Sequence, residues 1–470
     1  MDERLKDIRE RLPQGALRVA ERLRKADGRA CLVGGSIRDL MLGAAVKDWD
    51  FATDLPPERV RSLFPHAVDV GIRFGTILVI EADGSYEVTT FRRDGVYSDA
   101  RHPDSVAFTS SLEEDLARRD FTVNAMAYDL KEDRLVDPHS GRSDLTHRLI
   151  RSVGLPEERF REDALRLLRC IRIAGQLGFE IEEETFRALV RCAGLLGAIA
   201  RERIREEFDR ILAQDRPSLA IDRLFETGLL EGFMPELAAC YGVSQNRYHA
   251  FDVFYHSLCA VDQAPAGNRT VRLAALLHDL GKVDTKREEE DGGRATFYNH
   301  QAYSARKADA ILRRLRYPND ERERVVHLIQ QHMFHYERGW TDAAVRRFVR
   351  AVGPELLEDL FATRAADTLG NGLRRHAVSA ELKELQSRIA EIRKRAEALS
   401  VRDLKVDGSE LIRELGIEEG PVIGRLLDAL LDEVLEDPAR NERAALLARA
   451  AEIRPSIEAA TPPRRKRRIP

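Results

Sequence analysis

The sequence has few features of a secreted or membrane protein. Its 470 residues include only five cysteines, scattered and without a CxxC pair, so neither a disulfide framework nor a thiolate zinc site is expected. No apolar run approaches the ~18 residues that a membrane-spanning helix requires, and the first residues lack the apolar stretch of a signal peptide. We therefore expect a cytoplasmic protein that does not enter a membrane.

The charge is nearly balanced, which limits the way in which the protein can bind nucleic acid. There are 76 Lys and Arg against 80 Asp and Glu, a formal net charge of -4, so such affinity cannot rest on net charge alone. Hydrophobic residues make up 43% and charged residues 33%, enough for folded cores beneath a charge-dense surface. The basic run at residues 464–468 is interpreted as a solvated tail.

Strand and helix patterns divide the sequence into parts. Short β-rich runs alternate with helical segments from about residue 29 to 137, whereas apolar residues recur at helical spacing after about residue 155. At ~150 residues per domain, the length suggests about three domains. We predict an α+β protein with a small β-sheet head at residues 1–150, a helical neck at 151–215, a helical body at 216–375 and a helical tail at 376–470.

The first chemical signal is a glycine turn between a strand and a helix. Apolar residues 30–33 precede Gly34 and Gly35, and a helix capped by Ser36 is predicted to follow, with Arg38 in its first turn. Glycine lets a backbone approach a ligand, and the N–H groups at a helix N-terminus bind phosphate oxygens. The turn is typical of a phosphate site, but a plain connection between two elements is the alternative.

Carboxylates follow this turn. Asp48 and Asp50 are two residues apart on a predicted strand, so their side chains would point to one face, where mutual repulsion favours a bound cation. Mg²⁺ suits the site because it takes carboxylate and phosphate oxygens. Glu87, on the β-rich run at residues 86–91, is predicted to complete a catalytic site for nucleotidyl transfer. A solvated acidic strand end is the alternative.

Several motifs in a fixed order resemble a known family. They are VGGSIRD at residues 33–39, DWDFAT at 48–53, RRDFTVNAMA at 118–127 and an Asp-Pro pair at 137–138. Together they resemble the bacterial and eukaryotic (class II) CCA-adding tRNA nucleotidyltransferases, whose superfamily includes poly(A) polymerases. The resemblance implies that Asp48 and Asp50 bind Mg²⁺. It also implies that the nucleotide contacts Gly34, Gly35, Ser36, Arg38, Arg119, Asp120 and Asn124.

The neck carries a pattern suited to reading a base. Asp163, Arg166 and Arg169 recur every three residues and are predicted to share one polar face of a helix; a surface ladder of ion pairs is the alternative. An ionised aspartate only accepts hydrogen bonds and an arginine only donates them, so the first two residues would fit C and A but not G and U. The resemblance implies a bracing motif at residues 202–208 and nucleotide contacts at Glu162, Asp163, Arg166, Arg169 and Arg172.

Residues 91–103 are predicted to form a mobile loop, since glycine, serine and proline alternate there with charged residues. In the family that the motifs resemble, this loop helps the pocket to switch from C to A, and enzymes that add only CC lack it. Its presence argues against a CC-only enzyme but does not separate CCA addition from addition of the terminal A alone.

A second cluster lies in the helical half of the chain. The run LAALLHDLGK at residues 273–282 places His278 and Asp279 in an apolar helix, where an ionisable pair needs compensation such as a bound metal. With His256 and Asp367, this order of residues resembles the HD superfamily of metal-dependent phosphohydrolases; a structural remnant is the alternative. The resemblance implies a divalent transition metal held by His256, His278, Asp279 and Asp367, with His300 and His332 as ligands of a second metal.

The resemblance implies an enzyme that adds C, C and A from CTP and ATP to the tRNA 3′ end, using Mg²⁺ and no nucleic-acid template. No protein partner is implied. The tail glycines Gly420 and Gly424 are predicted either to admit a tRNA phosphate or to belong to an ordinary capped helix. The alternative functions are an A-adding enzyme, a poly(A) polymerase, an HD phosphohydrolase with an RNA-docking head, and a noncatalytic RNA-binding protein.

Overall fold

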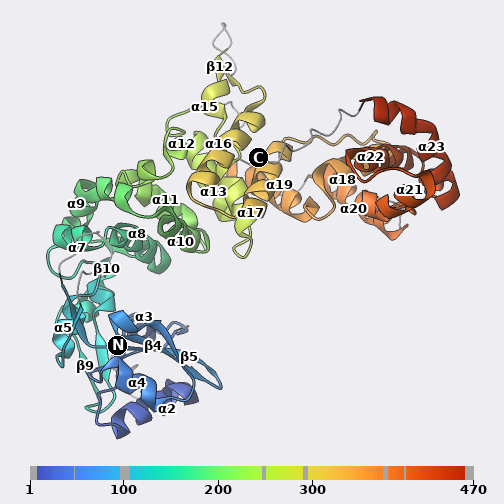
Figure 1. Ribbon diagram of the computed structural model, residues 1–470. Helices are drawn as coiled ribbons and strands as arrows, with labels where there is room; N and C mark the ends of the chain where they lie inside the picture. The colour runs from blue at the N-terminus through green and yellow to red at the C-terminus, as the bar shows by residue number, and fades with distance from the viewer. Residues whose placement is uncertain are drawn as a thin grey trace, which may run out of the picture. The chain divides into compact units, whose positions relative to one another are not determined.

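The structure, a computed structural model, describes residues 8–46, 48–95, 106–245, 250–288, 295–373, 379–395 and 399–460. Most of the predicted loop at 91–103 and the basic run at 464–468 lie outside these ranges. The chain divides into two compact units, Met1–Ala239 with Arg313–Tyr317, and Cys240–Leu312 with Pro318–Pro470. A β-sheet with helices forms the N-terminal part, and helices dominate the rest (Figure 1), which confirms the predicted α+β class. The four-part domain division stays a prediction.

Within the described residues, the head contains a seven-stranded sheet in the order β3-β4-β5-β2-β1-β8-β9. β2 and β5 are parallel, and the other neighbouring strands are antiparallel. The predicted β-rich runs coincide with β1, β4, β5, β8 and β9. The strands are β1 (Cys31–Val33), β2 (Asp50–Thr53), β3 (Ala67–Gly71), β4 (Thr76–Glu81), β5 (Gly84–Thr90), β8 (Ala127–Asp129) and β9 (Arg134–Val136).

Helices pack on this sheet because one side of each is apolar. In α2, Val19 and Leu23 are four residues apart and fully buried, and α2 contacts β5 and α4. β6 (Arg92–Asp94) and β7 (Val106–Phe108) form a separate antiparallel pair. The helices of the head are α1 (Ile8–Arg11), α2 (Gln14–Lys25), α3 (Gly35–Leu42), α4 (Pro57–Leu63), α5 (Leu112–Ala117) and α6 (Gly141–His147).

The neck is helical, as predicted, but it breaks where one continuous helix face was expected. α7 ends at Glu162 and α8 begins at Leu165, while Asp163 is extended and its Oδ1 accepts the Leu165 N–H at 3.0 Å. Aspartate competes in this way for backbone donors and so favours helix ends. The helices are α7 (Pro156–Glu162), α8 (Leu165–Leu177), α9 (Glu183–Cys192), α10 (Arg201–Leu212), α11 (Pro217–Glu226) and α12 (Pro235–Ala238), with the short strands β10 (Leu149–Ile150) and β11 (Glu180–Ile181).

In the second unit, α13 packs against α14 and α19. Small residues allow close approach there: a Cβ added to Gly370 would lie 2.6 Å from the Ala260 backbone nitrogen. The elements are α13 (Val253–Gln263), α14 (Arg269–Leu277), α15 (Lys282–Thr285), β12 (Arg287–Glu288), β13 (Ala295–Thr296), α16 (His300–Arg314), α17 (Asn319–Gln331), α18 (Asp342–Val352), α19 (Leu357–Gly370) and α20 (Ala380–Lys394).

The tail has its own apolar core. Leu426, Leu430 and Val434 on α22 are fully buried, and α22 packs against α21 and α23. Gly420 immediately precedes α22, and Gly424 lies within its first turn. The tail helices are α21 (Gly408–Leu415), α22 (Pro421–Glu436) and α23 (Arg443–Ala460). In the part of the chain that the structure describes, no helix combines the length and the apolar character needed to cross a membrane.

Candidate active site and metal centre

A pocket of about 680 Å³ is lined by residues of both the head and the neck, within the first unit. It brings together segments from the glycine turn, the sheet, the RRDFT motif and the start of α8. The predicted site residues that line it are Gly34, Gly35, Asp50, Glu87, Arg119, Asp120, Asn124, Asp163, Arg166 and Arg169. The lining does not include Asp48, Ser36, Arg38, Glu162 or Arg172.

An acidic pair lies on one wall. Asp50 of β2 and Glu87 of β5 occupy paired positions on parallel strands, so their side chains project from the same face of the sheet. Burial and the charge of Glu87 raise the pKa of Asp50 to about 6, although Arg119 opposes the shift. Asp48 is exposed and precedes β2, so the prediction of two aspartates on one strand is wrong. Strand pairing begins only at Asp50.

Glycine is favoured at position 34 by the backbone conformation and by the closeness of neighbouring side chains. Gly34 is the N-cap of α3 with φ of 70°, a conformation that side chains disfavour. A Cβ there would lie 3.2 Å from Arg119 Nη1 and 3.8 Å from Asp50 Oδ2. The predicted cap, Ser36, is instead buried, and its hydroxyl donates to the Val33 carbonyl at 2.8 Å. Gly34 and Gly35 line the pocket, while Ser36 does not.

Arg38 acts on the pocket through another residue. It is 7% exposed, and its Nη1 donates to Asn124 Oδ1 at 2.8 Å. Asn124 in turn donates through Nδ2 to Asp120 Oδ1 at 3.3 Å. Direct contact between Arg38 and a nucleotide stays a prediction, because the structure places Asn124 and Asp120 at the pocket wall and Arg38 behind them.

An ion pair joins the RRDFT motif to the neck. Asp120 Oδ2 lies 2.6 Å from Arg169 Nη2 on α8. Burial alone would raise the pKa of Asp120, but the charges of Arg169 and Arg166 outweigh it and hold the pKa below its ordinary value. Arg118, Arg92 and Phe74 also line the pocket and were missed as site residues by sequence reasoning. Arg118 could have been found, since it begins the motif that supplied its neighbours.

Arg166, one of the two candidates for reading the base, is held by three hydrogen bonds. Arg166 is 8% exposed and donates to the Arg159 carbonyl (3.0 Å), to Glu162 Oε2 (2.6 Å) and to the Arg118 carbonyl (3.0 Å). These contacts use three of the five N–H donors of the guanidinium. Glu162 thus orients Arg166 and does not line the pocket.

The motif at residues 202–208 lies on α10 and forms ion pairs with two other residues of the neck. Arg203 Nη2 lies 3.4 Å from Asp163 Oδ2, and Glu207 Oε2 accepts the Nε–H of Arg172 at 2.6 Å. Glu207 is 3% exposed and also accepts from Arg210 at 3.0 Å. These ion pairs support the predicted bracing motif, and they direct Arg172 toward α10 and away from the pocket.

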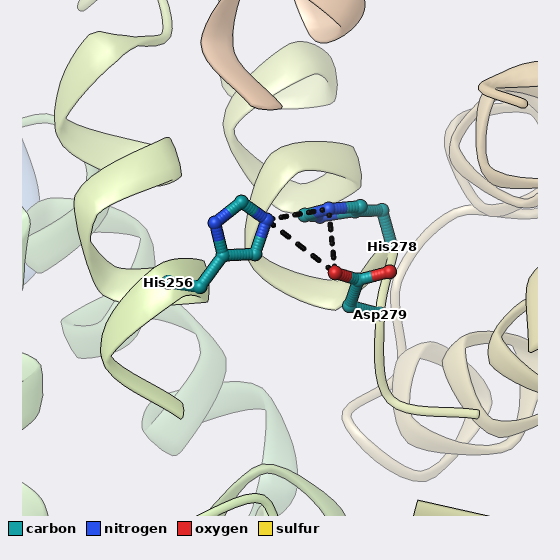
Figure 2. A group of neighbouring side chains, drawn as sticks. All are labelled: His256, His278 and Asp279. Atoms are coloured by element: carbon teal, nitrogen blue, oxygen red, sulfur yellow. Dashed lines mark hydrogen bonds and ion pairs between the residues drawn. The ribbon is translucent and has the colours of Figure 1, made fainter. Parts of the chain in front are cut away.

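A second polar cluster lies in the other unit, where six predicted residues meet. Figure 2 shows His256 of α13 facing His278 and Asp279, which follow α14. The two Nε2 atoms are 3.2 Å apart, and Asp279 Oδ2 lies 3.4 Å from His256 Nε2 and 3.2 Å from His278 Nε2. Asp367 Oδ1 lies 3.2 Å and 3.6 Å from the same nitrogens. Four ligand atoms ~2.1 Å from one ion in a tetrahedron would lie ~3.4 Å apart, close to these distances.

His300 and His332 extend the cluster on its other side. His300 Nε2 lies 3.2 Å from Asp279 Oδ1 and 3.4 Å from His332 Nε2. In the described residues, two groups could therefore each hold an ion, and they share Asp279. The structure brings all six predicted ligands together.

The histidine tautomers favour metal binding. Nδ1 of His278, His300 and His332 lies 2.7 to 2.8 Å from the carbonyl three residues earlier in the chain. A carbonyl only accepts, so each Nδ1 carries the proton, and in a neutral ring Nε2 then offers a lone pair to the cluster. This arrangement is typical of metal-ligating histidine.

The cluster attracts positive charge. Burial would lower the pKa of His278, but Asp279 and Asp367 outweigh burial and raise it to about 10. Burial would raise the pKa of both carboxyls. The charges of His278 and Lys282 hold the pKa of Asp279 well below its ordinary value, and hydrogen bonds from His256 and His278 do the same for Asp367. Lys282 Nζ lies 2.6 Å from Asp279 Oδ2. Two buried carboxylates that draw positive charge from their neighbours in this way are suited to binding a metal cation.

Comparison with known proteins places both units in one family. Residues 30–151 match the family described as "Poly A polymerase head domain", residues 178–241 match "Probable RNA and SrmB- binding site of polymerase A", and residues 287–450 match a second domain of tRNA nucleotidyltransferases. The chain resembles the crystal structure of the Bacillus stearothermophilus CCA-adding enzyme in complex with CTP, with a TM-score of 0.69 and 30% identity, over 95% of this chain and 99% of that one.

Relatives found by sequence similarity are also CCA-adding enzymes. The CCA-adding enzyme of Geobacillus kaustophilus is 46% identical over 224 residues, 48% of this chain and 55% of that protein. The CCA-adding enzyme of Streptococcus thermophilus is 34% identical over 438 residues, 93% of this chain and 96% of that protein. With a match of that extent, and with the head pocket built as described, this chain belongs to the CCA-adding enzyme family.

Proposed function

We propose that this chain extends the tRNA 3′ end with C, C and A, taking the nucleotides from CTP and ATP. The proposal rests on family membership and on one observation, that a single pocket holds both the Asp50–Glu87 pair and the Asp163–Arg166 pair. The first pair suits phosphoryl chemistry, and the second suits selection of a base. A cytoplasmic location and the absence of a protein partner stay predictions.

A divalent cation, Mg²⁺ by preference, fits the acidic wall. Asp50 and Glu87 would hold it, with Asp48 near enough to raise the pKa of Asp50. The donor set is all carboxylate oxygen, as a hard cation requires. When bound, the cation neutralises the phosphate oxygens and orients the attacking and leaving groups.

The remaining residues bind and select the nucleotide. Backbone N–H groups at the Gly34–Gly35 turn, with the guanidinium of Arg119, face the position for the triphosphate. Asp163 accepts from the exocyclic amine of C or A, and Arg166 donates to the adjacent ring nitrogen. G and U present the reverse order, so an acceptor would face Asp163 and a donor would face Arg166. The tRNA 3′-hydroxyl attacks the α-phosphate, and pyrophosphate leaves.

The deciding experiment supplies tRNA that lacks CCA, with CTP and ATP separately and together. Incorporation of two C residues from CTP, followed by one A when ATP is added, supports the proposal. No incorporation from CTP, but addition of A to tRNA ending in CC, would establish the A-adding enzyme instead. Repeated A addition would indicate a poly(A) polymerase.

For the second unit we propose a metal-dependent phosphohydrolase centre. Six ligands converge, and the neutral rings of His278, His300 and His332 would present a lone pair at Nε2. His256, His278, Asp279 and Asp367 would hold one divalent transition metal, and His300 and His332 would complete a second site with Asp279. Bound metal would supply a nucleophilic hydroxide at neutral pH. By resemblance, a substrate is a 2′,3′-cyclic phosphate at a damaged tRNA end.

The hydrolase proposal is tested on the full chain loaded with Mn²⁺, Ni²⁺ or Zn²⁺. Hydrolysis of a 2′,3′-cyclic nucleotide that is lost in His256→Ala but kept in Asp50→Asn supports it. Metal binding without hydrolysis of any phosphoester would reduce the centre to a structural site.

A further inference from the structure

Asp115 of α5 is a buried carboxylate without a role in the function proposed above. Its side chain is 0% exposed. Oδ1 accepts from Arg118 Nη2 at 2.7 Å and Nε at 3.0 Å, and from the Arg92 backbone N–H at 3.3 Å. Oδ2 accepts from Arg119 Nη2 at 3.1 Å. One carboxylate therefore holds two consecutive arginines, each on a different oxygen.

Both arginines line the active-site pocket, whereas Asp115 lies behind them. Arg119 Nη1 lies 3.2 Å from the Cβ position of Gly34, so its free edge faces the glycine turn. The backbone carbonyl of Arg118 accepts from Arg166, one of the base-reading pair. Burial would raise the pKa of Asp115, but the charges of Arg119 and Arg118 outweigh it and hold the pKa below its ordinary value. Asp115 is thus ionised near neutral pH.

We propose that Asp115 is a positioning residue for the nucleotide triphosphate: it fixes Arg118 and Arg119 with their free N–H donors toward the phosphates. This inference rests on the proposed nucleotidyl transfer. An arginine held on one side loses little rotational freedom when it binds a phosphate on the other, which preserves affinity. Because the phosphates of CTP and ATP are identical, the effect is the same for both nucleotides.

Asp115→Asn separates this role from simple packing. Asparagine has the shape of aspartate but only one acceptor oxygen, so its NH₂ group would face the donors of one arginine. That arginine is then less fixed before the nucleotide binds, and ordering it on the phosphate costs ~0.5 to 1.5 kcal/mol, which corresponds to a KM about 2- to 13-fold higher. The KM for CTP and for ATP should rise by the same factor, and kcat should change less.

The head offers a matched control in Asp129. It is 1% exposed and pairs with Arg29 Nη2 at 2.8 Å, but neither residue lines the pocket. Asp129→Asn therefore removes a comparable buried charge without releasing a pocket arginine. Its KM values should equal those of the unmodified chain even if its melting temperature falls.

The experiment measures initial rates on tRNA ending in C with CTP and on tRNA ending in CC with ATP. Equal KM rises in Asp115→Asn, absent in Asp129→Asn, support the proposal. A triple variant Asp115→Asn/Arg118→Gln/Arg119→Gln with a KM no higher than that of Arg118→Gln/Arg119→Gln supports it as well, because Asp115 then has no pocket arginine left to hold. Unchanged KM values, a matching rise in Asp129→Asn, or additive effects would overturn it. If the unmodified chain transfers nothing, the proposed function fails and not this inference.

If Asp115→Asn does not fold, Arg118→Lys and Arg119→Lys provide the second test. Each keeps the charge but lacks the planar fork that can bind carboxylate on one edge and phosphate on the other. A KM rise common to CTP and ATP is expected in both. No rise in either variant would overturn the proposal.

Discussion

Asp50 on β2 and Glu87 on β5 are directly paired residues of two parallel strands. We expect Asp50→Asn to lower nucleotide incorporation at least ~10³-fold, because it removes a charge from the site that would hold the catalytic cation. Single-turnover incorporation from CTP measures the effect. Glu81→Gln, which removes the charge of an ion pair with Arg18 at the end of β4, is the control and should stay near the unmodified rate. Transfer by Asp50→Asn within tenfold of the unmodified rate would exclude the two-carboxylate mechanism.

Asp163→Ala should relax the choice of base. The variant loses the acceptor that faces the exocyclic amine of C or A, so discrimination against U should weaken by ~1 to 3 kcal/mol, about 5- to 150-fold. Competition between CTP and UTP on tRNA lacking CCA provides the measurement. Arg161→Ala, on the exposed face of α7, should leave the C-to-U ratio unchanged. An unaltered ratio in Asp163→Ala would mean that the base is read elsewhere.

His278→Ala should abolish binding of a divalent transition metal, because His278 Nε2 lies within 3.6 Å of three other ligand atoms. Mass spectrometry of the purified, metal-loaded chain gives the stoichiometry. A chelator should lower the melting temperature of the unmodified chain but not of the variant, since bound metal stabilises only the folded state. His335→Ala removes an exposed histidine, 82% accessible, and should bind metal normally. Equal metal content in the two variants would contradict the site.

Gly370→Ala and Gly424→Ala should have opposite effects on stability. A Cβ at Gly370 would lie 2.6 Å from the backbone of Ala260, so α13 and α19 must separate at a cost of ~1 to 3 kcal/mol. A Cβ at Gly424 meets no atom within 4 Å, and alanine should stabilise α22 by up to ~1 kcal/mol. Denaturant unfolding of each variant checks both signs. Equal losses of unfolding free energy in the two variants would show that the close approach of α13 and α19 does not determine the effect of Gly370→Ala.

Local patterns predicted much of the fold. The strands around Cys31, Ile77 and Val88 and the helical neck follow from residue periodicity, because each face of a strand or helix repeats its own polarity. The break at Asp163 did not, since it depends on a single side chain capturing the Leu165 N–H. Ser36 likewise took a backbone partner in place of a cap. Such choices between competing local hydrogen bonds are not visible in a pattern of polarity.

The sequence by itself determined the types and order of the chemical groups: the glycine turn, the carboxylates, the Asp163–Arg166 pair and the HD residues. Only the tertiary structure decided which of them meet. Strand register set Glu87 beside Asp50, and helix packing gathered His256, His278 and Asp367 around one point. The same packing turned Arg38 and Arg172 away from the pocket and placed Asp115 behind it. Register and packing depend on contacts between segments distant in the chain, which no local spacing encodes.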